Sequence, residues 1–186
     1  AAGGGGSTLI GNSNQATAGS WGTAFGWGNT ISGNNAVAMG ANNTASNYQA
    51  VALGATNTAS GYTSTALGYN NTSSGDSSFA VGHQNTASGY ASTALGYQNT
   101  ASARAAYAEG RNTVASGQCA HAEGWETEAS GNQAHAEGHG TQATARYNHV
   151  FGEYNISDSG FSAATARGTY IEIVGNGSDA QNRSNA

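Results

Sequence analysis

Small and larger side chains alternate along the chain in short runs that end at a glycine, and these runs recur every fourteen residues. In the run 50–54, Ala-Val-Ala-Leu-Gly, the small residues lie four and two places before the glycine, and the larger ones lie three and one place before it. Period-two alternation puts the two kinds on opposite faces of a strand. We therefore predict one short strand in each repeat, with the small residues on its inner face.

The glycine that ends each run, called the anchor glycine below, keeps its spacing over ten repeats. An alanine lies two places before nine of these glycines, and Val150 takes that place before the last. A fixed period this short is typical of a solenoid, in which each coil buries its apolar face only against its neighbours. The anchors are Gly26, Gly40, Gly54, Gly68, Gly82, Gly96, Gly110, Gly124, Gly138 and Gly152.

The second half of each repeat reads Asn-Thr-Ala-Ser-Gly, as at 57–61 and 85–89. Asn and Ser-Gly are typical of turns, because glycine supplies positive φ and Asn or Ser bonds nearby backbone. Each coil is thus predicted to be a strand, a glycine turn, a second short polar strand and another turn. The fold class that follows is all-β, a parallel β-roll or solenoid with 14-residue coils.

The repeat divides the chain into three parts. Residues 1–23 contain a glycine run and a displaced anchor, so we expect a flexible lead-in and an irregular first coil. Residues 24–155 are expected to form the β-roll. Residues 156–186 leave the repeat, and we expect a C-terminal capping or connector segment there.

The composition of the chain limits the kinds of partner that it is expected to bind. The net charge is -5, with no lysine among the basic residues, which argues against binding the phosphate backbone of a nucleic acid. The absence of proline suits strands in which every backbone N–H is needed. No apolar run approaches the length that spans a bilayer, and the single Cys119 excludes an intrachain disulfide. We expect no nucleic-acid partner, no membrane segment and no cofactor.

The larger residues of each strand form two outer columns, three places and one place before the anchor glycine. In the first half of the chain both columns are mostly apolar, and they would be exposed unless another chain covers them. We therefore predict an obligate oligomer whose interface includes Leu53, Leu67 and Leu95.

The outer columns turn polar from Tyr107 onward. The column nearest the anchor carries Glu109, Glu123 and Glu137, and carboxylates stacked about 5 Å apart repel by about 3 kcal/mol at an effective dielectric near 20. Histidines of the other column, or backbone N–H groups of an adjacent chain, would supply the partners that these carboxylates need. An alternative stays open, in which imidazoles from several chains meet on a common axis and bind a Zn- or Ni-type ion through His121, His135 or His149.

No residue set predicts an enzyme. The tripeptide His-Ala-Glu occurs twice near Cys119, but the Pro-Cys-x-x-Cys half of a zinc deaminase motif is missing. A glycan-cleaving protein needs paired carboxylates that face a groove, whereas the glutamates here are predicted to face an interface.

Aromatic side chains next to the turns are the candidates for receptor contact. Exposed tyrosines beside Asn and Ser suit stacking and hydrogen bonding with carbohydrate, although they would equally cover gaps between chains. The candidate contact residues are Tyr62, Tyr69, Tyr90, Tyr97 and Trp125.

The unit Asn-Thr-Ala-Ser-Gly-Tyr-x-Ser-x-Ala-Leu-Gly, at 57–68 and 85–96, resembles the head repeat of YadA-like trimeric adhesins. The resemblance covers residues 24–152. It implies a left-handed parallel β-roll assembled as a homotrimer, with the outer columns at the trimer axis. One function it implies is that of the head of a bacterial trimeric autotransporter adhesin, at the bacterial cell surface.

The later coils are also similar to tail and neck-appendage proteins of phages that infect Gram-positive bacteria. The similar residues are Ala-His-Ala-Glu-Gly at 120–124 and 134–138, the segment 148–155, and the tail 170–186. In that family the tail leads into a self-cleaving chaperone domain of the peptidase G2 kind, so residues 156–186 are expected to hold the start of such a region, truncated or cleaved. The resemblance implies a fibre of the virion that binds a glycan or protein receptor on the host cell. It also makes Ser178 and Asp179 a candidate autocleavage junction, although Gly-Ser-Asp is equally a turn sequence.

Overall fold

The computed structural model describes residues 6–17, 20–157 and 172–186. Within these ranges the chain forms strands, turns and bends, and no helix occurs there. Two compact units are present, residues 1–91 and residues 92–186. Each is a parallel β-solenoid with 14-residue coils, and the two contain about ten coils, as the sequence predicts.

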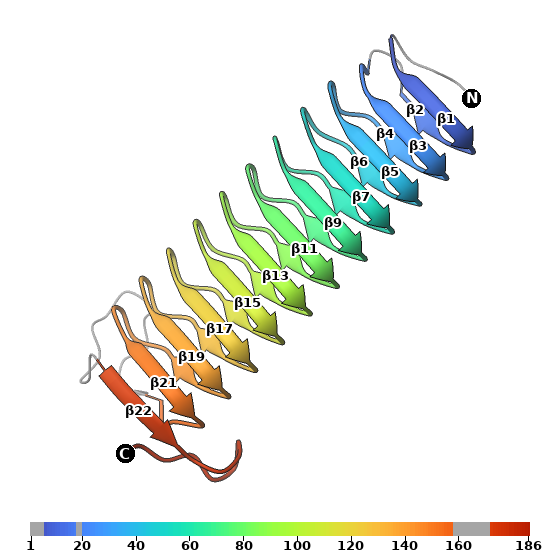
Figure 1. Ribbon diagram of the computed structural model, residues 1–186. Helices are drawn as coiled ribbons and strands as arrows, with labels where there is room; N and C mark the ends of the chain where they lie inside the picture. The colour runs from blue at the N-terminus through green and yellow to red at the C-terminus, as the bar shows by residue number, and fades with distance from the viewer. Residues whose placement is uncertain (1–5, 18–19, 158–171) are drawn as a thin grey trace. The chain divides into compact units, whose positions relative to one another are not determined.

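Each coil of the first unit contributes one long and one short strand, and the two kinds form separate sheets (Figure 1). The long strands, in sheet order, are β1 (Thr8–Asn12), β3 (Thr23–Trp27), β5 (Val37–Ala41), β7 (Val51–Ala55), β9 (Thr65–Tyr69) and β11 (Phe79–His83). The short strands are β2 (Gln15–Ala16), β4 (Thr30–Ile31), β6 (Thr44–Ala45), β8 (Thr58–Ala59), β10 (Thr72–Ser73) and β12 (Thr86–Ala87).

The second unit has the same arrangement. Its long strands are β13 (Thr93–Tyr97), β15 (Tyr107–Arg111), β17 (His121–Trp125), β19 (His135–His139), β21 (His149–Glu153) and β22 (Glu172–Asn176). Its short strands are β14 (Thr100–Ala101), β16 (Val114–Ala115), β18 (Glu128–Ala129) and β20 (Gln142–Ala143).

The anchor glycine lies inside the long strand and not in a turn after it, which corrects the predicted coil. Gly54 is the fourth residue of β7, with a φ of +114°, and it pairs in register with Gly68 of β9. A Cβ on Gly54 would lie 2.1 Å from the carbonyl oxygen of Gly68. Only glycine combines this backbone conformation with so close an approach of the next coil, which explains the unbroken period.

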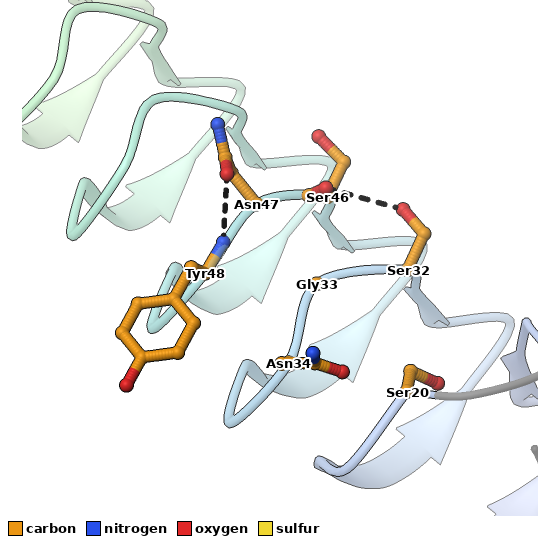
Figure 2. Close-up of a pocket in the computed structure, with 7 residues that line it drawn as sticks. All are labelled: Ser20, Ser32, Gly33, Asn34, Ser46, Asn47 and Tyr48. Atoms are coloured by element: carbon orange, nitrogen blue, oxygen red, sulfur yellow. Dashed lines mark hydrogen bonds between the residues drawn. The ribbon is translucent and has the colours of Figure 1, made fainter. Parts of the chain in front are cut away.

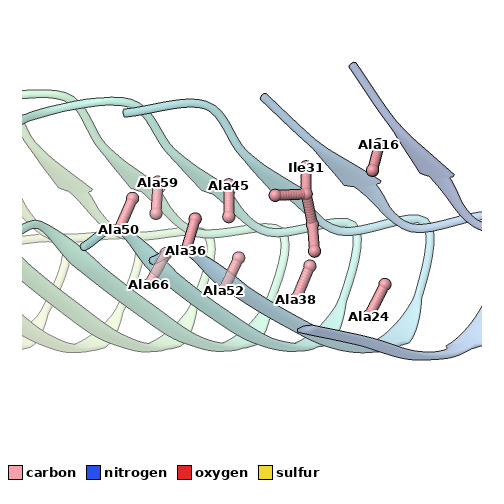
Figure 3. Packing of buried hydrophobic residues seen from close by; sticks show 10 residues of the cluster. All are labelled: Ala16, Ala24, Ile31, Ala36, Ala38, Ala45, Ala50, Ala52, Ala59 and Ala66. Carbon is pink, nitrogen blue, oxygen red and sulfur yellow. The ribbon is translucent and has the colours of Figure 1, made fainter. Parts of the chain in front are cut away.

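Alanines from the long and short strands fill most of the interior, and Figure 3 shows nine of them together with Ile31 in the first unit. Ala52, two places before an anchor, and Ala59, five places after it, are both completely buried. The residue four places before the anchor, such as Ala50, is buried as well. The predicted inner face is therefore confirmed, and it explains how a chain with few large apolar residues encloses a core.

Asparagines three places after the anchor lie in the connection between the two strands of a coil, and their side chains point into the interior, which the turn pattern did not predict. Asn57 is 1% exposed, and its Nδ2 donates to the carbonyl oxygens of Leu53 at 2.9 Å and Gly68 at 2.7 Å. Its Oδ1 accepts from the backbone N–H of Asn71, which stands at the same place in the next coil. We call this row the Asn ladder; in the first unit it comprises Asn14, Asn29, Asn43, Asn57, Asn71 and Asn85.

Both ends of the regular repeat carry strands. At the start, Gly11 pairs with Gly26, so the first coil has one residue more than the others; residues 1–5 of the expected lead-in lie outside the described part. At the other end, β22 pairs in parallel with β21, and Gly175 stands opposite Gly152. The sheet therefore does not end at Gly152, although the fourteen-residue spacing does.

Candidate functional site

The predicted interface residues all point away from the core of their own coil. In the first unit Phe25 is 54% exposed and Leu67 is 39% exposed, while Leu53 is half-buried. Leu95 of the second unit is also half-buried. The outer columns thus have the exposure that the sequence predicts for a surface between chains, and the trimer itself stays a prediction.

In the second unit, histidines and glutamates interleave along the outer columns. Each imidazole approaches the carboxylate of the coil before it. The separations between Nε2 and Oε1 are 3.7 Å for His121 and Glu109, 3.2 Å for His135 and Glu123, and 3.9 Å for His149 and Glu137. The sequence left open whether histidines or another chain partner the carboxylates. Within one chain, only the contact of His135 with Glu123 is a hydrogen bond among these three pairs, and the other two pairs are longer.

The three imidazoles also stack on one another. Ring centroids are 4.6 Å apart for His121 and His135, and 4.9 Å apart for His135 and His149. The rings thus form a row along one chain, and an axial ion bound by three chains stays a prediction. Within one chain, ligand atoms fall within 4.8 Å of one another in two groups, Glu109 with His121 and Glu123, and Glu123 with His135 and Glu137.

Tyr107 begins this polar face. Its hydroxyl donates to Oε2 of Glu109 at 3.4 Å, and its ring meets the imidazole of His121 edge to face. Partial burial and the neighbouring Glu109 carboxylate raise the pKa of Tyr107 above its ordinary value, because both disfavour the phenolate. The hydroxyl therefore stays a hydrogen-bond donor to Glu109 at neutral pH.

A second row of side chains in the same unit lies one or two places after the anchor glycines. The guanidinium of Arg111 lies 5.6 Å from the ring of Tyr97 and 5.4 Å from that of Trp125. Trp125 stacks on His139 at 4.3 Å, and the His139 ring nitrogen is 2.8 Å from the hydroxyl of Tyr154. We call these five residues the aromatic ladder. Tyr97 and Trp125, two predicted receptor contacts, are both in it, with 38% and 44% of their surface exposed.

The other predicted contacts lie in two different places of the first unit. Tyr69 follows an anchor and its ring lies 5.0 Å from that of His83. Tyr62 stands in the opposite turn, where it stacks on Tyr48 at 5.1 Å. Tyr90 occupies the equivalent turn position two coils later and is 56% exposed.

A polar surface pocket of about 390 Å³ lies between successive turns of the first unit (Figure 2). The Ser32 hydroxyl donates to the backbone oxygen of Ser46 at 3.4 Å, and the Asn47 side chain accepts from the N–H of Tyr48. These groups already serve as hydrogen-bond partners for neighbouring backbone. The pocket is formed by Ser20, Ser32, Gly33, Asn34, Ser46, Asn47 and Tyr48.

The proposed autocleavage junction has the geometry of a turn. The Asp179 carboxylate accepts from the backbone N–H groups of Gln181 and Asn182 and from the Asn182 side chain at 2.9 Å. These donors lower the pKa of Asp179 below its ordinary value, with the Asn182 side chain as the largest cause. The Ser178 hydroxyl lies 3.4 Å from the same carboxylate. Cleavage at this position stays a prediction.

Sequence reasoning missed Arg111, His139 and Tyr154 as members of the aromatic ladder. The signal was present for Arg111 and His139, because each lies one place after an anchor glycine, in register with Tyr97 and Trp125. Tyr154 lies two places after Gly152, where Glu153 takes the in-register place. The column mixes aromatic and cationic residues, so residue type alone does not mark it as one row.

Comparison with known families agrees with the repeat. The family model of the YadA head domain repeat, in two copies, matches residues 32–57, 59–85 and 87–106. None of the curated proteins compared with the chain matches it. No helix among the described residues has the length and apolar character needed to cross a lipid bilayer. The chain therefore contains YadA-like head repeats on a parallel β-solenoid, features of adhesin-type head domains.

Proposed function

We propose that this chain is a non-enzymatic, trimeric segment of a surface fibre, and that it attaches the fibre to a receptor on a host cell. The observation that carries the proposal is the aromatic ladder of the second unit. Trp, Tyr and Arg are the residues that most often dominate binding energy at interfaces, and here all three stack in one exposed row. The YadA-like head repeats support the adhesive role.

A trimer accounts for the apolar outer columns. Phe25, Met39 and Leu67 are each at least 39% exposed in one chain, and such a stripe is rarely left uncovered on a soluble protein. The same columns become His and Glu in the second unit, where the polar side chains interact with one another. The receptor is a glycan or a protein of the host cell surface, and neither nucleic acid nor a membrane is a partner.

For the carrier of this segment, we propose a phage tail fibre or appendage, so that the protein is part of a virion and acts outside the cell. The support is the similarity of the His-Ala-Glu coils and of residues 170–186 to phage appendage proteins that precede a peptidase G2-type chaperone. The alternative carrier is a bacterial trimeric autotransporter adhesin on the cell surface, which the match to YadA head repeats favours. Antibodies against the chain would label purified virions in the first case and intact bacterial cells in the second.

Binding of the full chain to whole cells and to arrayed glycans tests the adhesive function. Trp125→Ala removes the central ring of the aromatic ladder, and truncation of such a residue costs about 2 kcal/mol or more, or about a 30-fold loss of affinity. Val114→Ala is the matched control, because Val114 is comparably exposed but lies in β16 of the other sheet. Equal binding by wild type and Trp125→Ala would contradict the role of the ladder. Release of free sugar from the glycans would contradict the non-enzymatic assignment.

A further inference from the structure

A buried nitrogen atom in the polar face of the second unit has no hydrogen-bond partner. Nε2 of His121 is inaccessible to water and forms no hydrogen bond to any described residue, and its closest carboxylate oxygen, Oε1 of Glu109, is 3.7 Å away. Buried polar atoms are nearly always satisfied, so an unpaired one requires a specific explanation. In the neutral tautomer that is protonated at Nδ1, Nε2 carries a free lone pair, and a neutral imidazole nitrogen of this kind is the commonest metal ligand in proteins.

We propose that Glu109, His121 and Glu123 of a single chain bind one divalent transition-metal ion of the zinc class. One ligand atom from each of these residues lies within 4.8 Å of the other two. Ligand bonds to zinc are about 2.1 Å long, which places two ligands of a tetrahedral ion about 3.4 Å apart. The 3.7 Å separation of Nε2 and Oε1 is close to that value, and both side chains are more than one third exposed, so they have room to adjust.

We call Glu109, His121 and Glu123 the triad. Residues outside it form hydrogen bonds to both of its carboxylates. The Tyr107 hydroxyl donates to the second oxygen of Glu109, and His135 Nε2 lies 3.2 Å from Oε1 of Glu123. Such partners orient metal ligands and raise their affinity for the ion. The positive charge of the bound metal ion would also offset the repulsion between the carboxylates stacked in one column.

Neighbouring coils lack one part of this arrangement. In the group of Glu123, His135 and Glu137, the His135 nitrogen already has Glu123 as its partner at 3.2 Å. At the next level Nε2 of His149 is also unpaired, but the residue that follows Glu137 in its column is Phe151, which cannot bind a metal ion. The triad around His121 therefore combines two carboxylates with a free imidazole nitrogen. An imidazole with two carboxylates favours Zn²⁺, Co²⁺ or Ni²⁺ over Mg²⁺, which prefers oxygen ligands alone.

The triad differs from an ion held on an axis by three histidines in two measurable ways. It binds one ion per chain, whereas an axial site binds one ion per three chains. It also depends on Glu109 and Glu123, which an axial imidazole site does not need. The proposal is independent of the receptor and of the fibre that carries the chain.

Titration of the chelator-treated full chain with Zn²⁺ by isothermal calorimetry tests the proposal. We expect one ion per chain, with no displacement by excess Mg²⁺, and a loss of affinity of at least about tenfold in both His121→Ala and Glu109→Gln. Tyr107→Phe, which removes only the hydrogen bond to Glu109, is expected to weaken binding by about tenfold. Glu126→Gln is the matched control, since Glu126 is an exposed carboxylate of the same coil outside the triad.

Three results would overturn the assignment. The first is no uptake of Zn²⁺ by the wild-type chain. The second is one ion per three chains with affinity unchanged in Glu109→Gln, and the third is equal binding by His121→Ala and wild type. Circular dichroism and thermal unfolding of every variant, measured without metal, separate loss of the ligand from loss of the fold.

Discussion

The coil that contains β7, in the first unit, and the coil that contains β17, in the second, share one backbone but differ on both faces. In the first, the outer residues are Val51 and Leu53, and the interior polar residue is Asn57. In the second, the outer residues are His121 and Glu123, and Thr127 takes the interior place. Anchor glycines and inner alanines are unchanged between them. The same backbone therefore forms with different residues in the outer columns and at the interior polar position.

The interior difference has an energetic consequence. The Asn57 side chain bonds to the coils on both sides, through Asn43 Oδ1 and through the carbonyl oxygen of Gly68. The hydroxyl of Thr127 is buried and has no hydrogen-bond partner among the described residues. The first unit thus uses a satisfied polar row inside its solenoid, whereas part of the second unit places a shorter and less satisfied side chain there.

Replacement of an anchor glycine should have the largest effect and should be equal in the two coils. A Cβ would lie 2.1 Å from the next carbonyl oxygen in Gly54→Ala and 2.2 Å from it in Gly124→Ala, and both glycines have a φ near +110°. We expect each variant to lose about 3 kcal/mol of stability or more, measured by chemical unfolding. Thr56→Gly, at a φ of 56°, is the control and should be tolerated. A harmless Gly124→Ala would show that the coils do not share one backbone requirement.

Substitution of the interior polar residue should change the stability of the protein by different amounts in the two coils. Asn57→Ala leaves the carbonyl oxygens of Leu53 and Gly68 and the N–H of Asn71 without their partner, which should cost about 3 kcal/mol. Thr127→Val removes a buried hydroxyl that has no partner, so it should change stability by about 1 kcal/mol or less, towards stabilisation.

The melting temperatures of Asn57→Ala and Thr127→Val, each measured against wild type, compare the two interior positions directly. Thr58→Ala, one residue after Asn57 and outside the core, is a control that should leave the melting temperature nearly unchanged. Equal destabilisation by Asn57→Ala and Thr127→Val would show that the Asn ladder contributes nothing beyond its volume.

The smallest expected effect is a loss of stability at alkaline pH that depends on Tyr107 of the second unit. Tyr107 binds its proton more tightly in the folded chain than in the unfolded chain, since its pKa is raised from 10.0. The resulting stabilisation is fully present below pH 10 and is lost as the pH rises through the raised pKa. Above pH 10 the wild type should therefore lose stability faster than Tyr107→Phe, as followed by thermal unfolding. Parallel curves for the two proteins would contradict a raised pKa.

Most of the fold follows from the sequence, because the anchor glycine and the alternation before it determine strand, register and inner face together. The same alternation predicts that the Asn57 side chain lies in the interior. Asn57 and Ala59 flank Thr58, so alternation puts both on the face opposite Thr58, and in the structure both side chains are buried. Residue type alone does not indicate this burial, because asparagine beside Ser-Gly is typical of turns and most turn side chains face solvent.

Two other features of the structure could not be predicted from the repeat. The strand β22 stands twenty-three residues after β21, by the pairing of Gly175 with Gly152, so periodicity gives no reason to place it in the sheet. The local signs are Ile173, which is buried opposite Val150, and Gly175, which follows it at the spacing of an anchor glycine. The pairing of His121 with Glu109 of the preceding coil depends on side-chain direction, which column positions alone do not determine.

The molecular mass of the folded chain in solution tests the central claim most directly, because the apolar outer columns of the first unit and the attachment function both depend on association of three chains. Sedimentation equilibrium at neutral pH should give a mass three times the 18.5 kDa of one chain. A folded species of 18.5 kDa would contradict the trimer and would leave the exposed Phe25, Met39 and Leu67 without an explanation.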